Sequence, residues 1–331
     1  MDWTNKEAVL KAIRHNAMDL QFAAKFFQSD KDIVITAVKE YGFALRYADK
    51  SLQLDKEIVM TAIKQTSLSL QYVDKSLQSD KEIVMTAVKQ YGCALQYADK
   101  SLQSDREIVM IAVQNNGFAL QYADKSLQSD REIVMAAVQN CGSALKYSDK
   151  LFQSDREIVM IAVKRNGYAL EYATEFLQKD IELVTEAVKE CGNAIKFADK
   201  SLKTNKQVVL TALQNSGADC YVNFEDNPLK KDEDFLLKAI KIRCRLIEFA
   251  DKKLQLDKNF VLKAMKQDGI TLRYVNDSLK MDEDIISEAI DHGFTDQDLY
   301  WPPINFDTKF IEKVKHIIQC KNSIIFFRTF N

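Results

Sequence analysis

The stretch DREIVMIAVQNNGFALQYADKSLQS, residues 105–129, decides the fold because the chain repeats it. It returns at residues 130–154 as DREIVMAAVQNCGSALKYSDKLFQS, and DKEIVMTAVKQYGCALQYADKSLQS precedes it at residues 80–104. The period is 25 residues, and this tiling leaves no room for a separate catalytic domain. With the Asp as position 1, the thirteen repeats begin at Asn5, Asp30, Asp55, Asp80, Asp105, Asp130, Asp155, Asp180, Asn205, Asp232, Asp257, Asp282 and Asp307.

Each repeat has the pattern of a helical hairpin. Ser at position 25 followed three residues later by Glu, as in Ser104 and Glu107, resembles a capping box and predicts the start of a helix. Eight of the nine glycines fall on position 13, so we expect that helix to end there in a left-handed conformation. Positions 14 to about 23 predict a second, shorter helix with an aromatic ring at position 18. Ala at position 8 in twelve of the thirteen repeats predicts closely stacked helices.

An isolated pair of helices this small cannot bury a stable core, so the repeats must stack on one another. We therefore predict an all-α fold, an α-solenoid of about thirteen 25-residue helix-turn-helix repeats. The 9 Gly and 3 Pro are too few for an all-β fold. Because all three prolines lie where the periodicity fails, we divide the chain into a regular array at 1–218, an insertion or kink at 219–231, imperfect repeats at 232–293 and a C-terminal cap at 294–331.

Composition restricts the function classes. The 46 Lys+Arg and 48 Asp+Glu give a net charge of −2, without the basic excess of proteins that neutralise many phosphates. The first residues lack the pattern of a signal peptide, and no apolar stretch approaches the ~20 residues that span a bilayer, so we expect a cytosolic chain. The six cysteines show no CxxC spacing, which argues against a zinc site, and no motif indicates a cofactor.

The positions that differ most between repeats are 7, 11 and 14, as expected for a recognition surface on a fixed framework or for drift between duplicated repeats. Position 10 is mostly Lys or Gln, and such a row could bind an extended acidic partner. The alternative is a solvated face, on which Glu at position 3 and Lys at position 10 share one stripe and partly cancel. The candidate partner-binding residues are Lys64, Lys89, Ile111, Gln114, Phe118, Gln139, Ile161, Lys164, Tyr168 and Lys189.

Three functional hypotheses follow. The leading one is a non-catalytic scaffold that binds a protein or peptide, with no cofactor, nucleic acid or membrane as partner. The second is an enzyme or enzyme regulator with a site in the irregular C-terminal third, built from His292, His316 or Cys320. The third is binding of single-stranded RNA with one base per repeat, against which the near-neutral charge speaks.

The tandem pattern SDREIVMxAVxxxGxALxYADKSLQ resembles a helical-repeat family known only as a domain of unknown function. The unit of that family has about fifty residues and would contain two of the repeats counted above. The resemblance covers most of the chain and implies an association with amoeba-infecting bacteria, protists and large DNA viruses. It also implies a role inside a host cell, as an effector or host-interaction protein, but no activity and no functional residues.

Overall fold

A computed structural model describes residues 2–216, 226–300 and 306–329, and these residues form helices without any strand. Each predicted repeat contributes one long helix, which begins at position 2 and in most repeats has ten residues. The predicted all-α solenoid is thereby confirmed. The long helices are α1 (Lys6–His15), α3 (Lys31–Glu40), α4 (Lys56–Gln65), α5 (Lys81–Gln90), α7 (Arg106–Asn115), α9 (Arg131–Asn140), α11 (Arg156–Arg165), α12 (Ile181–Glu190), α13 (Lys206–Gln214), α14 (Glu233–Ile242), α16 (Lys258–Gln267), α18 (Glu283–Asp291) and α19 (Thr308–Thr329).

In repeats 1–8, 10 and 11 the second half is a six-residue 3₁₀ helix followed by a short helical turn, so the predicted single helix over positions 14–23 is wrong. Between the two lies an extended residue such as Ala123, with φ −67° and ψ 151°. The 3₁₀ helices are η1 (Ala17–Phe22), η2 (Gly42–Tyr47), η4 (Ser67–Tyr72), η6 (Gly92–Tyr97), η7 (Gly117–Tyr122), η8 (Gly142–Tyr147), η9 (Gly167–Tyr172), η11 (Gly192–Phe197), η14 (Cys244–Phe249) and η15 (Gly269–Tyr274). The short elements are α2 (Lys25–Gln28), η3 (Leu52–Leu54), η5 (Leu77–Ser79), α6 (Lys100–Gln103), α8 (Lys125–Gln128), α10 (Lys150–Gln153), η10 (Leu177–Lys179), η12 (Leu202–Thr204), α15 (Lys252–Gln255) and α17 (Asp277–Lys280).

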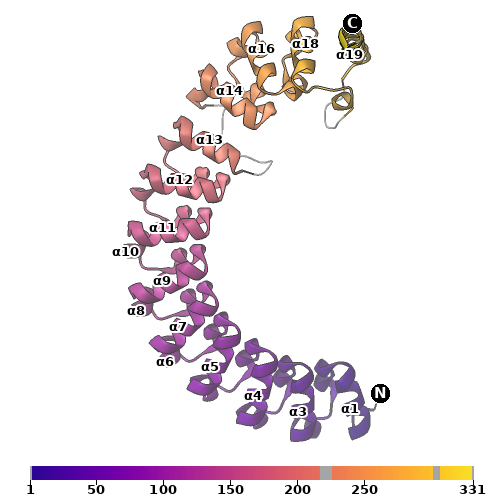
Figure 1. The fold of residues 1–331 in the computed structure, drawn as a ribbon. Helices are drawn as coiled ribbons and strands as arrows, with labels where there is room; N and C mark the ends of the chain where they lie inside the picture. The colour runs from indigo at the N-terminus through magenta and orange to yellow at the C-terminus, as the bar shows by residue number, and fades with distance from the viewer. Residues whose placement is uncertain (1, 217–225, 301–305, 330–331) are drawn as a thin grey trace. The chain divides into compact units, whose positions relative to one another are not determined.

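By its internal contacts the chain forms two compact segments, residues 1–190 and 191–331. In the first segment each long helix packs against the next, as α7 does against α9, and the 3₁₀ helices form a second row, as η6 against η7 (Figure 1). In the second segment α14, α16, α18 and α19 pack in the same successive order. The nearest-neighbour packing of a repeat array is therefore present within each segment.

Each long helix begins after the Asp or Asn at position 1. Asp105 Oδ1 accepts hydrogen bonds from the backbone N–H groups of Glu107 (2.9 Å) and Ile108 (3.1 Å), which makes Asp105 the N-cap. Ser104 instead ends the preceding short helix, and its hydroxyl donates to the carbonyl of Lys100. The predicted capping box is wrong, because the carboxylate one residue later reaches the free N–H groups and its charge favours the helix N-terminus.

The glycines at position 13 are required by stacking. Helix α7 ends at the extended residue Asn116, with φ −149° and ψ 110°. Among the described residues, a positive φ occurs only at Gly293 (102°). The described glycines at position 13 are therefore not left-handed, and the predicted left-handed caps are wrong there. A Cβ on Gly92 would lie 2.1 Å from the carbonyl oxygen of Ala112, at position 8 of the next repeat. The small residues at positions 8 and 13 thus let two successive repeats approach each other.

The core lies between the row of long helices and the row of 3₁₀ helices. In repeat 5 (residues 105–129) the side chains of Ile108, Val109, Val113 and Leu120 have an exposed fraction of 0%. Burying such side chains stabilises the fold by roughly 1.5–3 kcal/mol each. The same four positions are fully buried in repeats 2–7, so one core runs through the stack of the first segment.

The C-terminal repeat consists of α19 alone. Its Lys313 and Lys321 donate to the carbonyls of Met281 and Ser287, which ties α19 to the preceding repeats. Residues 217–225, which include the first part of the insertion predicted at 219–231, lie outside the described residues, as do residues 301–305 of the predicted C-terminal cap. Residues 226–231 contain η13 (Pro228–Lys231), and the described part of the C-terminal region also contains η16 (Gln297–Leu299). The boundaries drawn at 218, 231 and 293 remain predictions.

Candidate functional site

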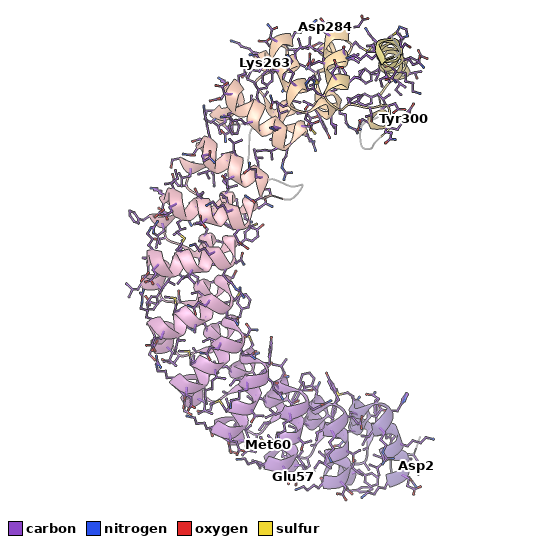
Figure 2. The ribbon with its side chains drawn as sticks, viewed as in Figure 1. Asp2, Glu57, Met60, Lys263, Asp284 and Tyr300 are labelled. Carbon is purple, nitrogen blue, oxygen red and sulfur yellow. The ribbon has the colours of Figure 1, made fainter. Side chains whose placement is uncertain are left out.

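A ladder of ion pairs runs along the N-terminal ends of the long helices. Lys81 Nζ lies 2.9 Å from a carboxylate oxygen of Asp105 and 2.8 Å from one of Glu107, and it joins repeat 4 to repeat 5. We call these helix ends, with the short elements that lead into them, the ladder edge; Glu57 marks it in Figure 2. The equivalent pairs join Lys31 to Asp55 and Glu57, Lys56 to Asp80 and Glu82, Arg106 to Asp130 and Glu132, Arg131 to Asp155 and Glu157, and Arg156 to Asp180 and Glu182.

The ladder lowers the pKa of the Asp carboxylates at position 1, as in Asp55 and Asp180. The hydrogen bond from Lys31 lowers the pKa of Asp55, against the opposing effect of partial burial, and the N–H of Ile58 lowers this pKa further. Arg156 lowers the pKa of Asp180 in the same way. The recurring acidic residues at positions 1 and 3 therefore cap helices and join repeats.

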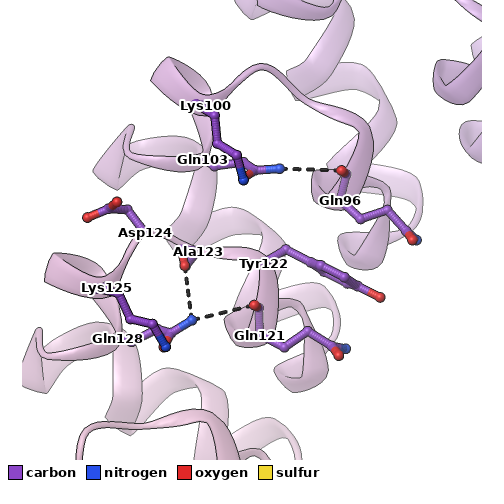
Figure 3. Close-up of a pocket in the computed structure, with 9 residues that line it drawn as sticks. All are labelled: Gln96, Lys100, Gln103, Gln121, Tyr122, Ala123, Asp124, Lys125 and Gln128. Atoms are coloured by element: carbon purple, nitrogen blue, oxygen red, sulfur yellow. Dashed lines mark hydrogen bonds between the residues drawn. The ribbon is translucent and has the colours of Figure 1, made fainter.

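Two further recurring residues have structural roles that the sequence analysis did not assign. Gln103 is buried, and its Nε2 donates to the carbonyls of Leu95 (3.1 Å), Gln96 (3.3 Å) and Ala98 (3.2 Å), which ends η6 (Figure 3). The N–H of Asp124 donates to the Gln103 carbonyl at 2.9 Å, across the boundary between repeats. Asp124 Oδ1 then caps α8 through the N–H of Ser126.

The opposite edge consists of positions 10–18, at the C-terminal ends of the long helices and on the six-residue 3₁₀ helices; we call it the 3₁₀ edge. On this edge, the side chain at position 11 connects two repeats through hydrogen bonds. Asn115 Nδ2 donates to the Lys89 carbonyl (3.0 Å), and Asn115 Oδ1 accepts from the Gly92 N–H (2.7 Å). Gln65 and Gln90 make the corresponding donation to the preceding repeat. The variation at position 11 therefore includes exchanges between Gln and Asn, and the amide groups of both residue types bond to the preceding repeat.

Position 10 provides exposed side chains on the 3₁₀ edge. Position 3 stands about 10 Å further along the helix axis at 1.5 Å per residue, and Glu at position 3 is paired with the preceding repeat. The expected cancellation between Glu at position 3 and Lys at position 10 is therefore wrong. Of this row, Lys189 donates to Glu186 at 2.6 Å. The exposed residues predicted at position 10 are Lys64, Lys89, Gln114, Gln139, Lys164 and Lys189.

The other predicted site residues lie on or next to this edge. Ile111 and Ile161 are half-buried on α7 and α11, one turn before position 10. Phe118 at the start of η7 is 39% exposed, and its ring meets that of Tyr147 in the next repeat at 6.2 Å between centroids and 82° between planes. Tyr168 is half-buried on η9.

Sequence reasoning missed positions 12, 17 and 18 as members of this surface. Half-buried tyrosines at position 18 form a row, and Arg46 at position 17 lies 5.5 Å from the ring centroid of Tyr72 in the next repeat. Burial, and then the neighbouring Cys93 thiol and Tyr91, raise the pKa of Tyr122. Tyr122 therefore presents a neutral hydroxyl group at neutral pH. Variation at positions 12 and 17 between repeats was the available sequence signal.

Shallow grooves follow the same period. One of about 480 Å³ is lined by Gln96, Gln121, Tyr122, Lys125 and Gln128 among others (Figure 3). The next, of about 360 Å³, shares Gln121, Lys125 and Gln128 with it. In Figure 3 the side chains of Gln96, Gln121 and Tyr122 extend to the same side. Both grooves therefore lie between the 3₁₀ helices and the short elements of the ladder edge, and they recur from one repeat to the next over repeats 4–6.

Sequence comparison agrees with this periodic geometry. A family described as Domain of unknown function (DUF4116) matches residues 5–53, 55–103, 80–128, 105–153, 130–178, 180–225, 205–255 and 257–294. The chain belongs to the DUF4116 family. Matches such as 80–128 and 105–153 are offset by 25 residues, so one DUF4116 unit spans two of the repeats described above. No curated protein and no solved structure matches the chain.

Of the residues of the alternative catalytic hypothesis, His292 lies in the matched DUF4116 segment 257–294, whereas His316 and Cys320 follow that segment. On α19 the Cys320 Sγ atom and His316 Nε2 are 3.7 Å apart on an exposed surface. His292 follows α18, and its Nδ1 lies 3.0 Å from the Glu288 carbonyl and 3.3 Å from a Glu288 carboxylate oxygen. The structure thus pairs His316 with Cys320 and places His292 beside Glu288.

The described residues contain neither a metal-binding cluster nor a membrane-spanning helix. No group of three or more His, Cys, Asp or Glu side chains in that part of the chain has an arrangement that could hold a metal ion. None of its helices combines the length and the apolar character needed to cross a bilayer.

Proposed function

We propose that this DUF4116 chain is a non-catalytic scaffold that binds an extended segment of a protein or peptide along the 3₁₀ edge of residues 1–190. The supporting observation is that the recurring residues and the varying residues of a repeat have different roles. Residues that recur hold one repeat on the next, as Asp105, Gly92 and Gln103 do. Side chains that vary, at positions 10, 12, 14 and 17, lie on the 3₁₀ edge. A stacked array displays them as a periodic surface, the arrangement by which repeat proteins bind extended partners.

The chemistry of this edge suits a polypeptide. The half-buried Tyr122 has an apolar ring and a polar tip, the combination that is enriched at protein interfaces. Exposed Gln114 and Gln139 supply both donors and acceptors for a peptide backbone. We place the binding in the cytosol, and the resemblance to proteins that act in host cells extends the proposal to a host partner.

Photocrosslinking tests the proposal on the full chain. A photoreactive phenylalanine is placed at Phe118 or Tyr91 on the 3₁₀ edge, and at Leu151 or Phe176 on the ladder edge as matched exposed controls. After irradiation in native cytosol, crosslinked peptides are sequenced by mass spectrometry. We expect Phe118 and Tyr91 to capture one partner at neighbouring points of its sequence. Capture from Leu151 and Phe176 alone, or equally from all four sites, would reject the 3₁₀ edge as the binding surface.

A loss-of-function series addresses the alternative catalytic hypothesis. Alanine at His316, Cys320 or His292 should leave partner capture unchanged, because these residues lie in the other segment of the chain. If any one of the three substitutions abolishes capture, the scaffold proposal is wrong.

A further inference from the structure

The 3₁₀ edge of the first segment carries positive charge that the near-neutral composition conceals. Between Tyr41 and Leu170, positions 10–18 contain no Asp or Glu, and the acids that flank this stretch on the same edge are Glu40, next to Lys39, and Glu171. All the cations of this stretch are exposed, and they lie outside the ion ladder. They are Arg46, Lys64, Lys89, Lys146, Lys164 and Arg165.

The compensating carboxylates lie on the other edge and are already bonded. Asp105 and Glu107 hold Lys81, and Asp124 caps α8. Along the axis of α7, Glu107 lies about 10 Å from position 10, where the 3₁₀ edge begins, and this separation exceeds the Debye length of ~8 Å at physiological salt. The two edges therefore present different potentials to a partner.

The cations fall into two groups. Arg46, Lys64 and Lys89 belong to repeats 2–4, while Lys146 and the pair at 164–165 belong to repeats 6 and 7. Repeat 5 between them has no cation at positions 10–18 and instead exposes Phe118, 39% accessible. At 8–10 Å between packed helices, the centres of the two groups are roughly 30 Å apart. An extended chain covers that distance in about ten residues.

From this distribution we infer that the partner segment is acidic and bipartite: two clusters of Asp or Glu, separated by about ten residues with an apolar side chain between them. The inference rests on the proposed function and specifies the chemistry of its partner. Carboxylates complement the two cationic groups, and the apolar side chain meets Phe118. This charge pattern also fixes the register of the partner along the repeats.

Single-stranded nucleic acid fits the same surface less well. Base stacking needs free aromatic faces, but Arg46 lies over Tyr72, Lys146 lies over Tyr147, and Phe118 meets Tyr147 edge-on. Moreover, a regular phosphate chain carries no neutral centre to match repeat 5. Binding of an oligonucleotide is therefore kept as a contrary outcome of the test.

The test uses fluorescence anisotropy with the full chain and a labelled peptide that has two Glu triplets about ten neutral residues apart, with a central Leu. Comparison probes are a peptide of the same composition with its six Glu in one central block, a peptide with Lys in place of Glu, and an oligothymidylate. We expect the bipartite peptide to bind tightest, and its affinity to fall between about 50 and 300 mM NaCl because salt screens exposed charges.

Two charge-matched triple variants locate the binding. Lys64→Glu, Lys89→Glu and Lys164→Glu reverse the 3₁₀ edge, whereas Lys50→Glu, Lys75→Glu and Lys150→Glu reverse exposed lysines of the ladder edge. The first triple should raise the Kd of the bipartite peptide at least about tenfold, and the second less than about threefold, because only the first meets the peptide directly. Circular dichroism melts establish that both variants fold.

Each contrary result has a distinct meaning. If neither acidic peptide binds while photocrosslinks still map to Phe118 and Tyr91, the acidic partner is wrong and the scaffold function stands. If those crosslinks are absent as well, both proposals fall. Tighter binding of the oligothymidylate with the same dependence on Lys64, Lys89 and Lys164, or equal loss in both triple variants, would also overturn the inference.

Discussion

Gly92 faces the carbonyl oxygen of Ala112 so closely that a Cβ on residue 92 would lie 2.1 Å from that oxygen. Gly92→Ala should therefore force repeats 4 and 5 apart and lower the free energy of unfolding by about 1–3 kcal/mol. Complete unfolding is not expected, because Ser67 occupies the same position in repeat 3 and is buried there. Urea denaturation measures the change.

The control for this substitution is Gln96→Ala in the same 3₁₀ helix, where the side chain is half-buried and bonds locally to the Cys93 carbonyl. Its effect should stay within about 0.5 kcal/mol, as for most surface changes. Equal effects of the two substitutions would mean that the approach between repeats does not limit stability.

The N-cap residue at position 1 should contribute more to the free energy of unfolding than the ladder residue at position 3. Asp105 accepts two backbone hydrogen bonds and one from Lys81, whereas the side chain of Glu107 contacts Lys81. We expect Asp105→Ala to cost about 1–2 kcal/mol and Glu107→Ala less than about 0.5 kcal/mol in urea denaturation. Asp105→Asn should fall between them, since Asn5 and Asn205 cap the corresponding helices of other repeats. A larger loss from Glu107→Ala would show that the ion pair stabilises this helix start more than the cap does.

The hydrogen bonds of the buried Gln103 predict an unusual order of stability among its substitutions. Its Nε2 faces three carbonyl oxygens, so a donor is required at this place. Lys203 occupies the equivalent position in repeat 8 and donates to the Lys196 carbonyl. Gln103→Lys should thus be tolerated better than Gln103→Ala, and Gln103→Glu should be worst, because it turns a carboxylate toward the carbonyls. The loss from Gln103→Ala is about 1–3 kcal/mol, the cost of unpaired buried groups. Thermal melts rank the three variants, and a Glu variant as stable as Lys would contradict the assignment.

Acid should weaken the fold within a defined range. The pKa values of Asp55 and Asp180 are lowered by hydrogen bonds from Lys31 and Arg156. A carboxyl group with a lower pKa in the folded chain stabilises the fold above its unfolded pKa of about 3.9, and this contribution disappears as the pH falls through the lowered value. The free energy of unfolding should change little between about pH 7 and 5 and fall steeply below about pH 4.

The double variant Asp55→Asn and Asp180→Asn serves as the control for this pH dependence. It keeps both N-caps but removes two titrating groups, so it should be less stable at neutral pH and lose less stability on acidification. Guanidinium denaturation at each pH compares the two proteins. An unchanged acid profile would assign the pH dependence to other carboxyl groups.

Periodicity predicted the architecture because a 25-residue repeat with one apolar helical face has few ways to bury that face other than stacking. It could not predict the 3₁₀ helices, since their hydrogen-bond pattern is set by Gln128 and its equivalents, which bind the carbonyls at their ends. Nor could it distinguish Ser104 from Asp105 as the cap, because the two residues are adjacent in the sequence and both Ser and Asp are preferred at N-caps. Glycine at position 13 is likewise explained by its contact with the next repeat. The sequence pattern around a single helix end gives no information about that contact.

The candidate surface was predicted only in part. Variation located Lys64, Lys89 and Phe118, but it also selected position 11, where Asn115 serves stacking. One sequence signal for the ladder was available: where position 2 is the apolar Ile181, positions 1 and 3 of the next repeat are Asn205 and Gln207 in place of acids. The two edges differ in charge because the ladder pairs the carboxylates on one of them. The composition gives only the net charge of the chain, so it could not reveal this difference.

Removal of one whole repeat should leave a folded chain. Deleting residues 105–129 joins Ser104 to Asp130 and offers Lys81 the carboxylates of Asp130 and Glu132 in place of Asp105 and Glu107. Because contacts within the first segment are between neighbours, helicity per residue should be unchanged and unfolding should remain cooperative. Deleting residues 105–116 alone removes α7 but keeps η7, which then lacks the long helix that covers it, so this shorter deletion should destabilise the chain far more. Circular dichroism and urea denaturation compare the two, and equal damage from both would show that stability does not arise from interchangeable neighbours.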